Sequence, residues 1–305
     1  MSRNKPNILV IVNPNAGKRK TRQLRRKLEA RQENITIRET TYPRHSVQII
    51  QEEFDRHDVF VAVGGDGTVN EMATALLGSD KKLAVYPAGS GNGFAREFGF
   101  NKNLNQLMAA IASGKNLTTD AMLINGQVSM HVSGVGYDGE VAHDFAKLPG
   151  RGFWNYLFSS IRVFWQYNPI QASIELENET INGRFFMINL ANTAQFGYGA
   201  RIASQANPTD GLLELVLVRP MSLWAFVLFS LRLFLGTLKS SEHLSYRSTA
   251  GPITLKTSAR QFHRDGDPIL LESPVKIEIS TQKIKVADTG NTKFCNNSKS
   301  SEKSV

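Results

Sequence analysis

Apolar residues in the first part of the chain form continuous runs that alternate with helically spaced sets. Continuous apolar runs predict buried strands, which we expect at residues 7–12, 59–63 and 83–89, and a further strand-like segment lies at 35–42. Apolar residues at helical spacing predict helices at residues 22–32, 46–57, 69–78 and 104–114. Strands that alternate with helices of this length indicate βαβ units with right-handed crossovers. We therefore expect an N-terminal α/β domain built on a mostly parallel sheet.

The pattern changes after residue 120, where short alternating segments take over. An Asn-Gly pair at 125–126 lies between two of these segments and is a strong signal for a tight hairpin. Further short strands are expected within residues 172–192, 211–220, 251–258 and 274–287, and helices at 152–167 and 222–238. We therefore expect a β-rich C-terminal domain folded as an antiparallel sandwich.

These patterns divide the chain into domains at residues 1–121 and 122–281. A last strand near 282–288 is a candidate to complete the first domain. The tail at 289–305 is polar and rich in Ser and Lys, a composition that predicts disorder.

The apolar segment at 221–238 raises the question of a membrane span. Its length approaches the roughly 20 residues that a spanning helix needs, but Arg232 lies inside it and two serines and Gly236 dilute it. A core helix beneath a sheet fits better. A helix at a lipid interface is the third interpretation, and Trp224 would suit it.

Composition narrows the partners and the compartment. The net charge of +9 and the pI near 9.6 point to an anionic partner, such as phosphate, a membrane surface or nucleic acid. No RRM-type aromatic signature or helix-turn-helix pattern is evident, so nucleic acid is not expected. Cys295 is the one cysteine, which excludes an internal disulfide and fits a reducing compartment. The N-terminal apolar run is too short for a signal peptide, so we expect a cytoplasmic protein.

Two glycine-rich turns follow consecutive predicted strands, "GGDGT" at 64–68 and "PAGSGNG" at 87–93. Ligands bind at the carboxyl ends of the strands in such sheets, and the two turns would offer backbone N–H groups and positive helix ends to a polyphosphate. Asp66 could hold Mg²⁺ there or accept a proton from an attacking hydroxyl. Neither turn fits the P-loop pattern or a clean dinucleotide-binding pattern.

Several motifs resemble the diacylglycerol kinase catalytic family, which includes bacterial lipid kinases and sphingosine kinases. They are "VNPNAGK" at 12–18, "GGDGTVNE" at 64–71, "PAGSGNGFAR" at 87–96, "YDGEVA" at 137–142, "NPTDGLLELVLV" at 207–218 and "HRDGDPI" at 263–269. Their order is kept over most of the chain. The resemblance implies an N-terminal α/β domain of the phosphofructokinase and NAD kinase type, followed by an antiparallel β sandwich.

The resemblance also implies roles for individual residues. The catalytic residues would be Asp66, Asp120 and Asp265. The residues on the ATP side would be Asn13, Thr41, Gly65, Gly67, Thr68, Glu71, Gly89, Ser90, Asn92 and Asp267. Mg²⁺ would be held by Asp66, Asp120 and Asp267. Phosphoryl transfer depends on charge neutralisation and in-line positioning, so glycine turns, a metal and a base would suffice.

The residues by themselves leave other interpretations open. Asp265 in an Asp-Gly pair is also typical of a hairpin corner, and Asp120 could be a charged edge residue. Asp210 is expected to be a turn residue or a structural metal ligand. Glu71 would lie near the adenosine or orient its loop.

Two positions depart from the family pattern. Gly93 stands where many bacterial members have an aspartate, and Asp267 stands where glutamate is usual. The motif "PAGSGN" at 87–92 is more similar to that of sphingosine kinases, so the acceptor could be a long-chain base or another lipid alcohol instead of diacylglycerol. Gly93 removes a carboxylate that often joins the metal site in the family, and Asp267 has a side chain shorter by one methylene than glutamate, so both departures would affect how the metal ion is coordinated.

The expected function is ATP-dependent phosphorylation of a lipid alcohol by a cytoplasmic protein attached peripherally to an anionic membrane. The basic helix at 18–31 would attract anionic headgroups. Phe153, Tyr156 and Phe164 could line a lipid groove, or could belong to an aromatic helix packed on the sheet. A kinase of a soluble substrate, similar to NAD kinase, is one alternative. A catalytically silent nucleotide- and lipid-binding protein is the other.

Overall fold

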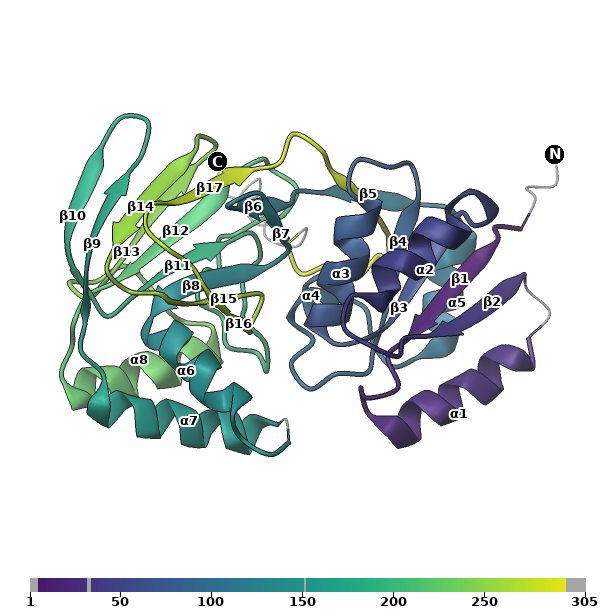
Figure 1. Cartoon of the computed structure of the whole chain (residues 1–305), viewed down its shortest axis with the longest axis horizontal. Helices are drawn as coiled ribbons and strands as arrows, with labels where there is room; N and C mark the ends of the chain where they lie inside the picture. The colour runs from purple at the N-terminus through teal and green to yellow at the C-terminus, as the bar shows by residue number, and fades with distance from the viewer. Residues whose placement is uncertain (1–4, 32–33, 151, 295–305) are drawn as a thin grey trace, which may run out of the picture. The chain divides into compact units, whose positions relative to one another are not determined.

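The structure, a computed structural model, describes residues 5–31, 34–150 and 152–294 of the chain (Figure 1). The chain divides into two compact units, Met1–Thr119 together with Gln282–Val305, and Asp120–Thr281. The first boundary falls between Thr119 and Asp120, two residues before the expected end of the first domain at residue 121.

The first unit contains one six-stranded sheet in the order β2-β1-β3-β4-β18-β5. Its strands are β1 (Ile8–Val12), β2 (Ile35–Glu39), β3 (Val59–Gly64), β4 (Lys82–Pro87), β5 (Asn116–Thr119) and β18 (Ile284–Ala287). All neighbouring strands are parallel except β5, which runs antiparallel to β18. Every residue of β1 and β3 is buried, as expected for central strands that are covered on both faces.

Helices connect the successive strands β1 to β5 of this sheet. They are α1 (Lys18–Glu29), α2 (His45–Glu53), the short 3₁₀ helix η1 (Phe54–Arg56), α3 (Asp66–Leu76), α4 (Gly93–Glu97) and α5 (Leu104–Ser113). The alternation of strands and helices confirms the predicted α/β domain. Among the described residues of the first unit, the helix that the sequence pattern missed is α4, because five residues are too few to show a helical period.

The segment after β18 packs against the first unit. The Thr289 hydroxyl donates to the Phe98 carbonyl at 2.7 Å, and the Lys293 N–H donates to the Glu97 carbonyl at 3.0 Å. The buried ring of Phe294 meets Phe98 edge to face, with 5.2 Å between ring centroids. The expected disorder is therefore wrong for residues 289–294, because an apolar ring anchors them. The rest of that tail, including Cys295, lies outside the described residues.

The second unit contains two six-stranded sheets whose neighbouring strands all pair antiparallel. The first sheet has the order β10 (Thr180–Phe185), β9 (Ile170–Glu175), β14 (Ile253–Thr257), β17 (Val275–Ile279), β6 (Met122–Ile124) and β7 (Gln127–Ser129). The second has the order β13 (Leu244–Thr249), β12 (Leu213–Val218), β11 (Met187–Ala191), β8 (Val132–Gly136), β15 (Gln261–Arg264) and β16 (Asp267–Leu270).

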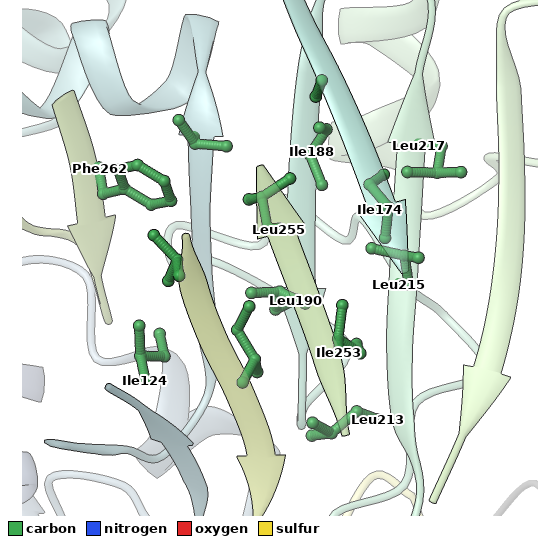
Figure 2. Packing of buried hydrophobic residues seen from close by; sticks show 14 of the residues in the cluster. Ile124, Ile174, Ile188, Leu190, Leu213, Leu215, Leu217, Ile253, Leu255 and Phe262 are labelled. Carbon is green, nitrogen blue, oxygen red and sulfur yellow. The ribbon is translucent and has the colours of Figure 1, made fainter. Parts of the chain in front are cut away.

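The two sheets pack face to face, which confirms the predicted sandwich. Ile174 and Leu255 of the first sheet share a buried cluster with Leu215 and Leu217 of the second (Figure 2). Val216 and Val218 of the same strand belong to a different cluster on the other face of the second sheet. This alternation follows from the two-residue period of a strand, so the second sheet is apolar on both faces.

Among the residues that the structure describes, three helices belong to the second unit: α6 (Tyr137–Ala146), α7 (Phe153–Gln166) and α8 (Leu223–Leu235). Side chains from all three pack on the cluster at the outer face of the second sheet. Within the described part of the chain, no helix has the length and apolar character needed to cross a bilayer. The segment considered as a span forms α8, whose 13 residues include one buried side chain, Phe229.

Two hairpins of the second unit turn on two residues each. Asn125 and Gly126 join β6 to β7 with φ angles of 46° and 77°. Asp265 and Gly266 join β15 to β16 with φ angles of 52° and 87°. Positive φ at both central residues matches the tight turns that Asn-Gly and Asp-Gly favour. The hairpin predicted at 125–126 is therefore confirmed, and Asp265 occupies a hairpin corner as well.

Candidate active site

Four strand ends bring the predicted nucleotide-side residues of the first unit to one edge of its sheet. Asn13 follows β1, Thr41 lies two residues beyond β2, Gly65 follows β3, and Gly89 lies two residues beyond β4. The four strands are adjacent and parallel, so their carboxyl ends meet at the same edge. This is the edge at which open α/β sheets bind ligands.

The two glycine-rich turns lie directly against each other. The N–H groups of Ala88 and Gly89 both donate to the Gly64 carbonyl, at 2.9 and 3.0 Å. A Cβ atom on Gly89 would lie 2.5 Å from the Gly65 Cα, a distance that backbone atoms cannot accommodate. The two turns therefore form one continuous backbone surface that depends on the absence of a side chain at residue 89.

Asp66 bridges this surface to the next helix. It is the first residue of α3, and its two carboxylate oxygens accept the N–H groups of Gly93 and Phe94, each at 3.1 Å. Gly93, the residue that departs from the family pattern, thus contributes a backbone donor to Asp66. A carboxylate oxygen can accept more than one bond, so these contacts remain compatible with a metal ion on the same group.

Asn13 and Thr68 connect the turn after β1 to α3. The Asn13 amide donates to the Thr68 hydroxyl at 3.2 Å, and the Asn13 side-chain oxygen accepts the Asn15 N–H at 3.0 Å. Thr68 is buried over Gly64, where a Cβ would lie 2.3 Å from the threonine hydroxyl oxygen. These contacts fix the orientation of two side chains that were expected on the nucleotide side.

Glu71 and Thr41 hold the turn that follows β2. Glu71 accepts the Arg44 N–H at 2.9 Å and also accepts the Ser46 hydroxyl. The Thr41 N–H donates to the Nδ1 atom of His45 at 3.1 Å. Through these bonds α3 positions the start of α2, so the contacts of Glu71 are those of a residue that orients a loop.

Asn92 shapes the turn after β4. It adopts a left-handed conformation with φ of 52°, which Asn tolerates better than most residues, and its amide donates to the Gly89 carbonyl at 2.8 Å. Ser90 is exposed, while Gly67 in the first turn of α3 is partly buried. The structure thus brings Gly65, Gly67, Gly89, Ser90 and Asn92 together around Asp66.

Asp265 lies in the second unit with its side chain almost fully buried, at 5% exposure. Its carboxylate accepts the Ser129 hydroxyl at 2.7 Å, the Met130 N–H at 2.8 Å and the His131 N–H at 2.9 Å. These donors immobilise the carboxylate in one orientation. The hairpin corner and the positioned carboxylate are therefore both properties of this residue.

Asp120 and Asp267 also belong to the second unit. Asp120 is buried and accepts the Gly211 N–H at 2.7 Å, and its own N–H donates to the Pro208 carbonyl at 2.7 Å. Asp267 is exposed at the start of β16. Asp120 is therefore tied to the turn that contains Asp210, whose own carboxylate accepts the Leu212 N–H at 2.9 Å.

Across the residues that the structure describes, no three His, Cys, Asp or Glu side chains are grouped to hold a metal ion. The predicted metal residues are divided between the units, with Asp66 in the first and Asp120 and Asp267 in the second. Mg²⁺ is commonly bound through one or two carboxylates together with substrate phosphates and waters. Asp66 at the glycine turns suits that mode of binding.

A buried polar network next to Asp265 was missed by the sequence analysis. Asp138 accepts the Nε2–H of His263 at 2.8 Å and also accepts the Asn189 amide. The Nδ1 atom of His263 accepts the Gly266 N–H at 3.3 Å, which assigns the ring proton to Nε2. The network supports the turn that carries Asp265. Asp138 is 125 residues from His263 in the chain, so no local signal could have joined them.

Comparisons with known proteins cover both units. Residues 7–124 match the family model of the diacylglycerol kinase catalytic domain. Residues 131–288 match the model of the YegS C-terminal NAD kinase beta sandwich-like domain. A diacylglycerol kinase of Bacillus subtilis (strain 168) is 24% identical over 269 residues, which are 85% of this chain and 88% of the relative.

Two further proteins are similar. A diacylglycerol kinase of Mycobacterium tuberculosis (strain ATCC 25618 / H37Rv) is 25% identical over 231 residues, 73% of this chain and 74% of the relative. A solved structure of a diacylglycerol kinase from Bacillus anthracis str. Sterne has a TM-score of 0.72 at 20% identity, over 94% of this chain and 98% of that chain. At this identity the structural likeness concerns the fold.

Proposed function

The chain belongs to the family of the diacylglycerol kinase catalytic domain and the YegS-type C-terminal domain, and from this membership we propose that it is an ATP-dependent lipid kinase. It transfers the γ-phosphoryl group of ATP to the hydroxyl of a lipid alcohol, with diacylglycerol and sphingoid bases as the candidate acceptors. Membership of a kinase family supports ATP use. The names of the relatives from Bacillus subtilis and Mycobacterium tuberculosis support a lipid acceptor.

The observation that carries the proposal is the position of Asp66, which lies within one glycine turn and accepts N–H groups at the end of the other. The residue before it, Gly65, has no side chain to satisfy the first N–H groups of α3. Backbone donors at such a helix start bind phosphate groups, and the second turn adds its own backbone. A carboxylate beside bound phosphates requires a cation between them, so this arrangement suits a nucleotide that arrives with Mg²⁺.

Asp66 is the residue of the first unit that would hold this metal. Mg²⁺, when bound, would neutralise the charge that develops on the phosphates during transfer. Asp120 and Asp267 remain proposed as further carboxylates of the metal and water network. Asn13, Thr68 and the turn around Asn92 position the nucleotide.

Asp265 is proposed to accept the proton of the lipid hydroxyl. A general base must be held within hydrogen-bond reach of the proton that it abstracts. The bonds from Ser129, Met130 and His131 hold this carboxylate in place. The network of Asp138 and His263 supports the turn that carries it.

The test is transfer of label from [γ-³²P]ATP with Mg²⁺ to lipid alcohols in mixed micelles, separated by thin-layer chromatography. The panel contains diacylglycerol, monoacylglycerol, sphingosine and ceramide. Asp66→Ala is compared with Asp80→Ala, which removes an exposed carboxylate from the same unit. We expect a labelled lipid with the wild type and with Asp80→Ala, and none with Asp66→Ala.

Near-normal transfer by Asp66→Ala would overturn the role assigned to Asp66. ATP binding without any labelled lipid would overturn the proposed lipid kinase function. NAD⁺ is included as a soluble acceptor, because the second unit matches a model described as NAD kinase beta sandwich-like. Labelled NADP⁺ would establish the soluble-substrate alternative, and ATP binding with no labelled acceptor would favour a silent binder.

A further inference from the structure

Helices α7 and α8 expose two matching stripes of large apolar side chains. In each helix the residues are spaced i, i+4, i+7 and i+11, which places them on one face. The α7/α8 face consists of Trp154, Phe158, Ile161, Trp165, Trp224, Leu228, Leu231 and Leu235. Each of these side chains is between 46% and 81% exposed. Soluble monomers rarely expose contiguous apolar patches of this kind without a function.

The opposite faces of both helices are already used. Tyr156, Val163 and Phe164 of α7 pack on the buried cluster at the outer face of the second sheet, as do Phe226 and Leu233 of α8. Tyr156 and Phe164 therefore point toward the sheet, in agreement with the interpretation of an aromatic helix packed on it. The side chains that meet solvent are a different set from those considered for a lipid groove.

The two stripes form one surface because the helices lie side by side and antiparallel. Phe153 at the start of α7 meets Phe234 at the end of α8, with 5.7 Å between ring centroids. Phe164 near the end of α7 stacks on Phe226 near the start of α8 at 4.3 Å. Figure 1 shows α7 and α8 next to each other along one side of the second unit. Each stripe is about 16 Å long at the helical rise per residue.

The tryptophans indicate what covers this face. All three tryptophans of the chain lie on it: Trp154 and Trp224 are the second residues of α7 and α8, and Trp165 is the last but one of α7. Tryptophan is enriched where water meets the bilayer, because its ring is apolar and its N–H remains hydrated. Tryptophans near helix ends with aliphatic residues between them are typical of a helix that lies in a membrane interface.

The charges point to the same occupant. Neither helix contains an Asp or Glu, and each contains one arginine, Arg162 or Arg232. Both arginines are exposed. The Arg162 guanidinium pairs with Asp144 and lies over the Phe158 ring, 5.5 Å from its centroid. Even with Arg162 paired to Asp144, the two helices and this carboxylate together carry a net charge of +1 (two arginines and one aspartate), which complements an anionic lipid surface.

We propose that the α7/α8 face docks on an anionic lipid bilayer, with its apolar side chains at the boundary between headgroups and acyl chains. Helices of 14 and 13 residues are too short to span, so both lie in the plane of the interface. This proposal rests on the proposed lipid kinase function where it concerns catalysis, because the α7/α8 face would then be the surface by which the enzyme reaches its lipid acceptor. Docking itself does not require catalysis and is measured separately.

The experiment uses the tryptophans as reporters, since the whole tryptophan emission of the protein arises from this face. Full-length protein is mixed, without ATP, with phosphatidylcholine vesicles that contain or lack phosphatidylglycerol. We expect a blue shift of the emission and quenching by lipids brominated on the acyl chains, with stronger binding to the anionic vesicles. Flotation of the vesicles measures the bound fraction independently.

The variant Ile161→Glu/Leu231→Glu places one charge on each stripe at exposed positions, so the fold is expected to persist. Its control, Asn178→Glu/Asn182→Glu, adds the same charge at exposed positions of β10 and of the turn before it. We expect at least about tenfold weaker vesicle binding by the first variant and unchanged binding by the control. Circular dichroism confirms that both are folded.

The outcomes separate docking from catalysis. Vesicle binding with no kinase activity on any lipid would support the docking face and overturn the proposed function. Transfer to a short-chain lipid alcohol in solution, by a protein that binds no vesicle, would support the kinase and overturn the docking proposal. Equal binding by the Ile161→Glu/Leu231→Glu variant and its control would also overturn it. A dimer that this variant dissociates, without vesicle binding, would assign the face to a second copy of the chain.

Discussion

Replacing Asp265 by asparagine keeps the size of a buried side chain and removes its charge. The carboxylate offers one oxygen to Ser129 and His131 and the other to Met130. An amide can replace only one of these two oxygens. In the better of its two orientations, the amide NH₂ group faces the Met130 N–H, so a buried donor loses its acceptor.

The expected loss follows from these contacts. A hydrogen bond to a charged group contributes about 1.5–3 kcal/mol, and a buried donor left unpaired costs about 1–3 kcal/mol. These quantities overlap, so Asp265→Asn should lower the free energy of unfolding by about 2–3 kcal/mol. Asparagine tolerates the left-handed backbone at φ 52°, so no further strain is expected. A domain stability of about 5–15 kcal/mol leaves this variant folded.

Asp265→Ala should lose more, about 5 kcal/mol. It leaves the N–H groups of both Met130 and His131 without the carboxylate, and alanine is disfavoured at positive φ. Ser129 is partly compensated, because its hydroxyl also bonds to Ser133 at 2.8 Å. Substitution by alanine, the usual test for a catalytic carboxylate, would therefore not distinguish loss of activity from loss of the fold. Asp265→Asn is the informative variant.

The assay is urea unfolding followed by near-UV circular dichroism, with Asp267→Asn as the control. Asp267 is an exposed carboxylate two residues away, so the control should change stability by less than about 0.5 kcal/mol. The reasoning is refuted if Asp265→Asn unfolds at the same urea concentration as the wild type, or if Asp265→Ala is as stable as Asp265→Asn. A folded but inactive Asp265→Asn would support the role as proton acceptor.

Three further predictions concern other parts of the molecule. Gly89→Ala places a Cβ 2.5 Å from the Gly65 Cα, so it should lower the free energy of unfolding by about 1–3 kcal/mol and weaken ATP binding measured by calorimetry. Gly152→Ala, with open space around the new Cβ, should change neither quantity. Phe294→Ala removes a buried ring from Phe98 and should destabilise the first unit by about 3 kcal/mol in thermal unfolding; an unchanged melting temperature would show that this segment does not anchor the unit. Burial is the main cause that raises the pKa of Tyr156 and Tyr246 from 10 to about 12. Because the folded state holds these protons more tightly, their contribution to stability is complete below pH 10 and is lost as the pH rises toward 12, so tyrosinate absorbance at these residues should appear together with unfolding; ionisation near pH 10 in a folded protein would contradict this.

The residue types alone were enough to predict those strands and turns in which every residue has the same surroundings. The runs that became β1 and β3 are apolar throughout and are buried throughout. The Asn-Gly pair at 125–126 forms the tight turn because both residues accept positive φ. The positions of the two glycine turns were also predictable, since each follows an apolar strand and leads into a helix.

The sequence could not show which face of α7 or α8 meets solvent. Helix α8 is apolar on nearly all sides, so its periodicity gives no direction. In α7 the polar residues do not mark the exposed side, since Ser159 is buried while Trp154 and Trp165 are exposed. The second sheet decides the direction by packing one side of each helix. The helix α6 was missed because Asp138 and Gly139 near its start resemble a turn. Its place depends on contact with β15, where a side chain at Gly139 would meet the Gln261 carbonyl.

The sequence by itself determined the fold class, the division into two domains and the positions of the glycine turns, because these depend on neighbouring residues. Only the tertiary structure decided how Asp265 is held, since its partner Ser129 is 136 residues away, and how Asp138 reaches His263. It also placed β18 between β4 and β5 and anchored Phe294 on Phe98. Hydrogen bonds and apolar contacts act between atoms that are close in space, and a chain brings such atoms together only when its core has formed.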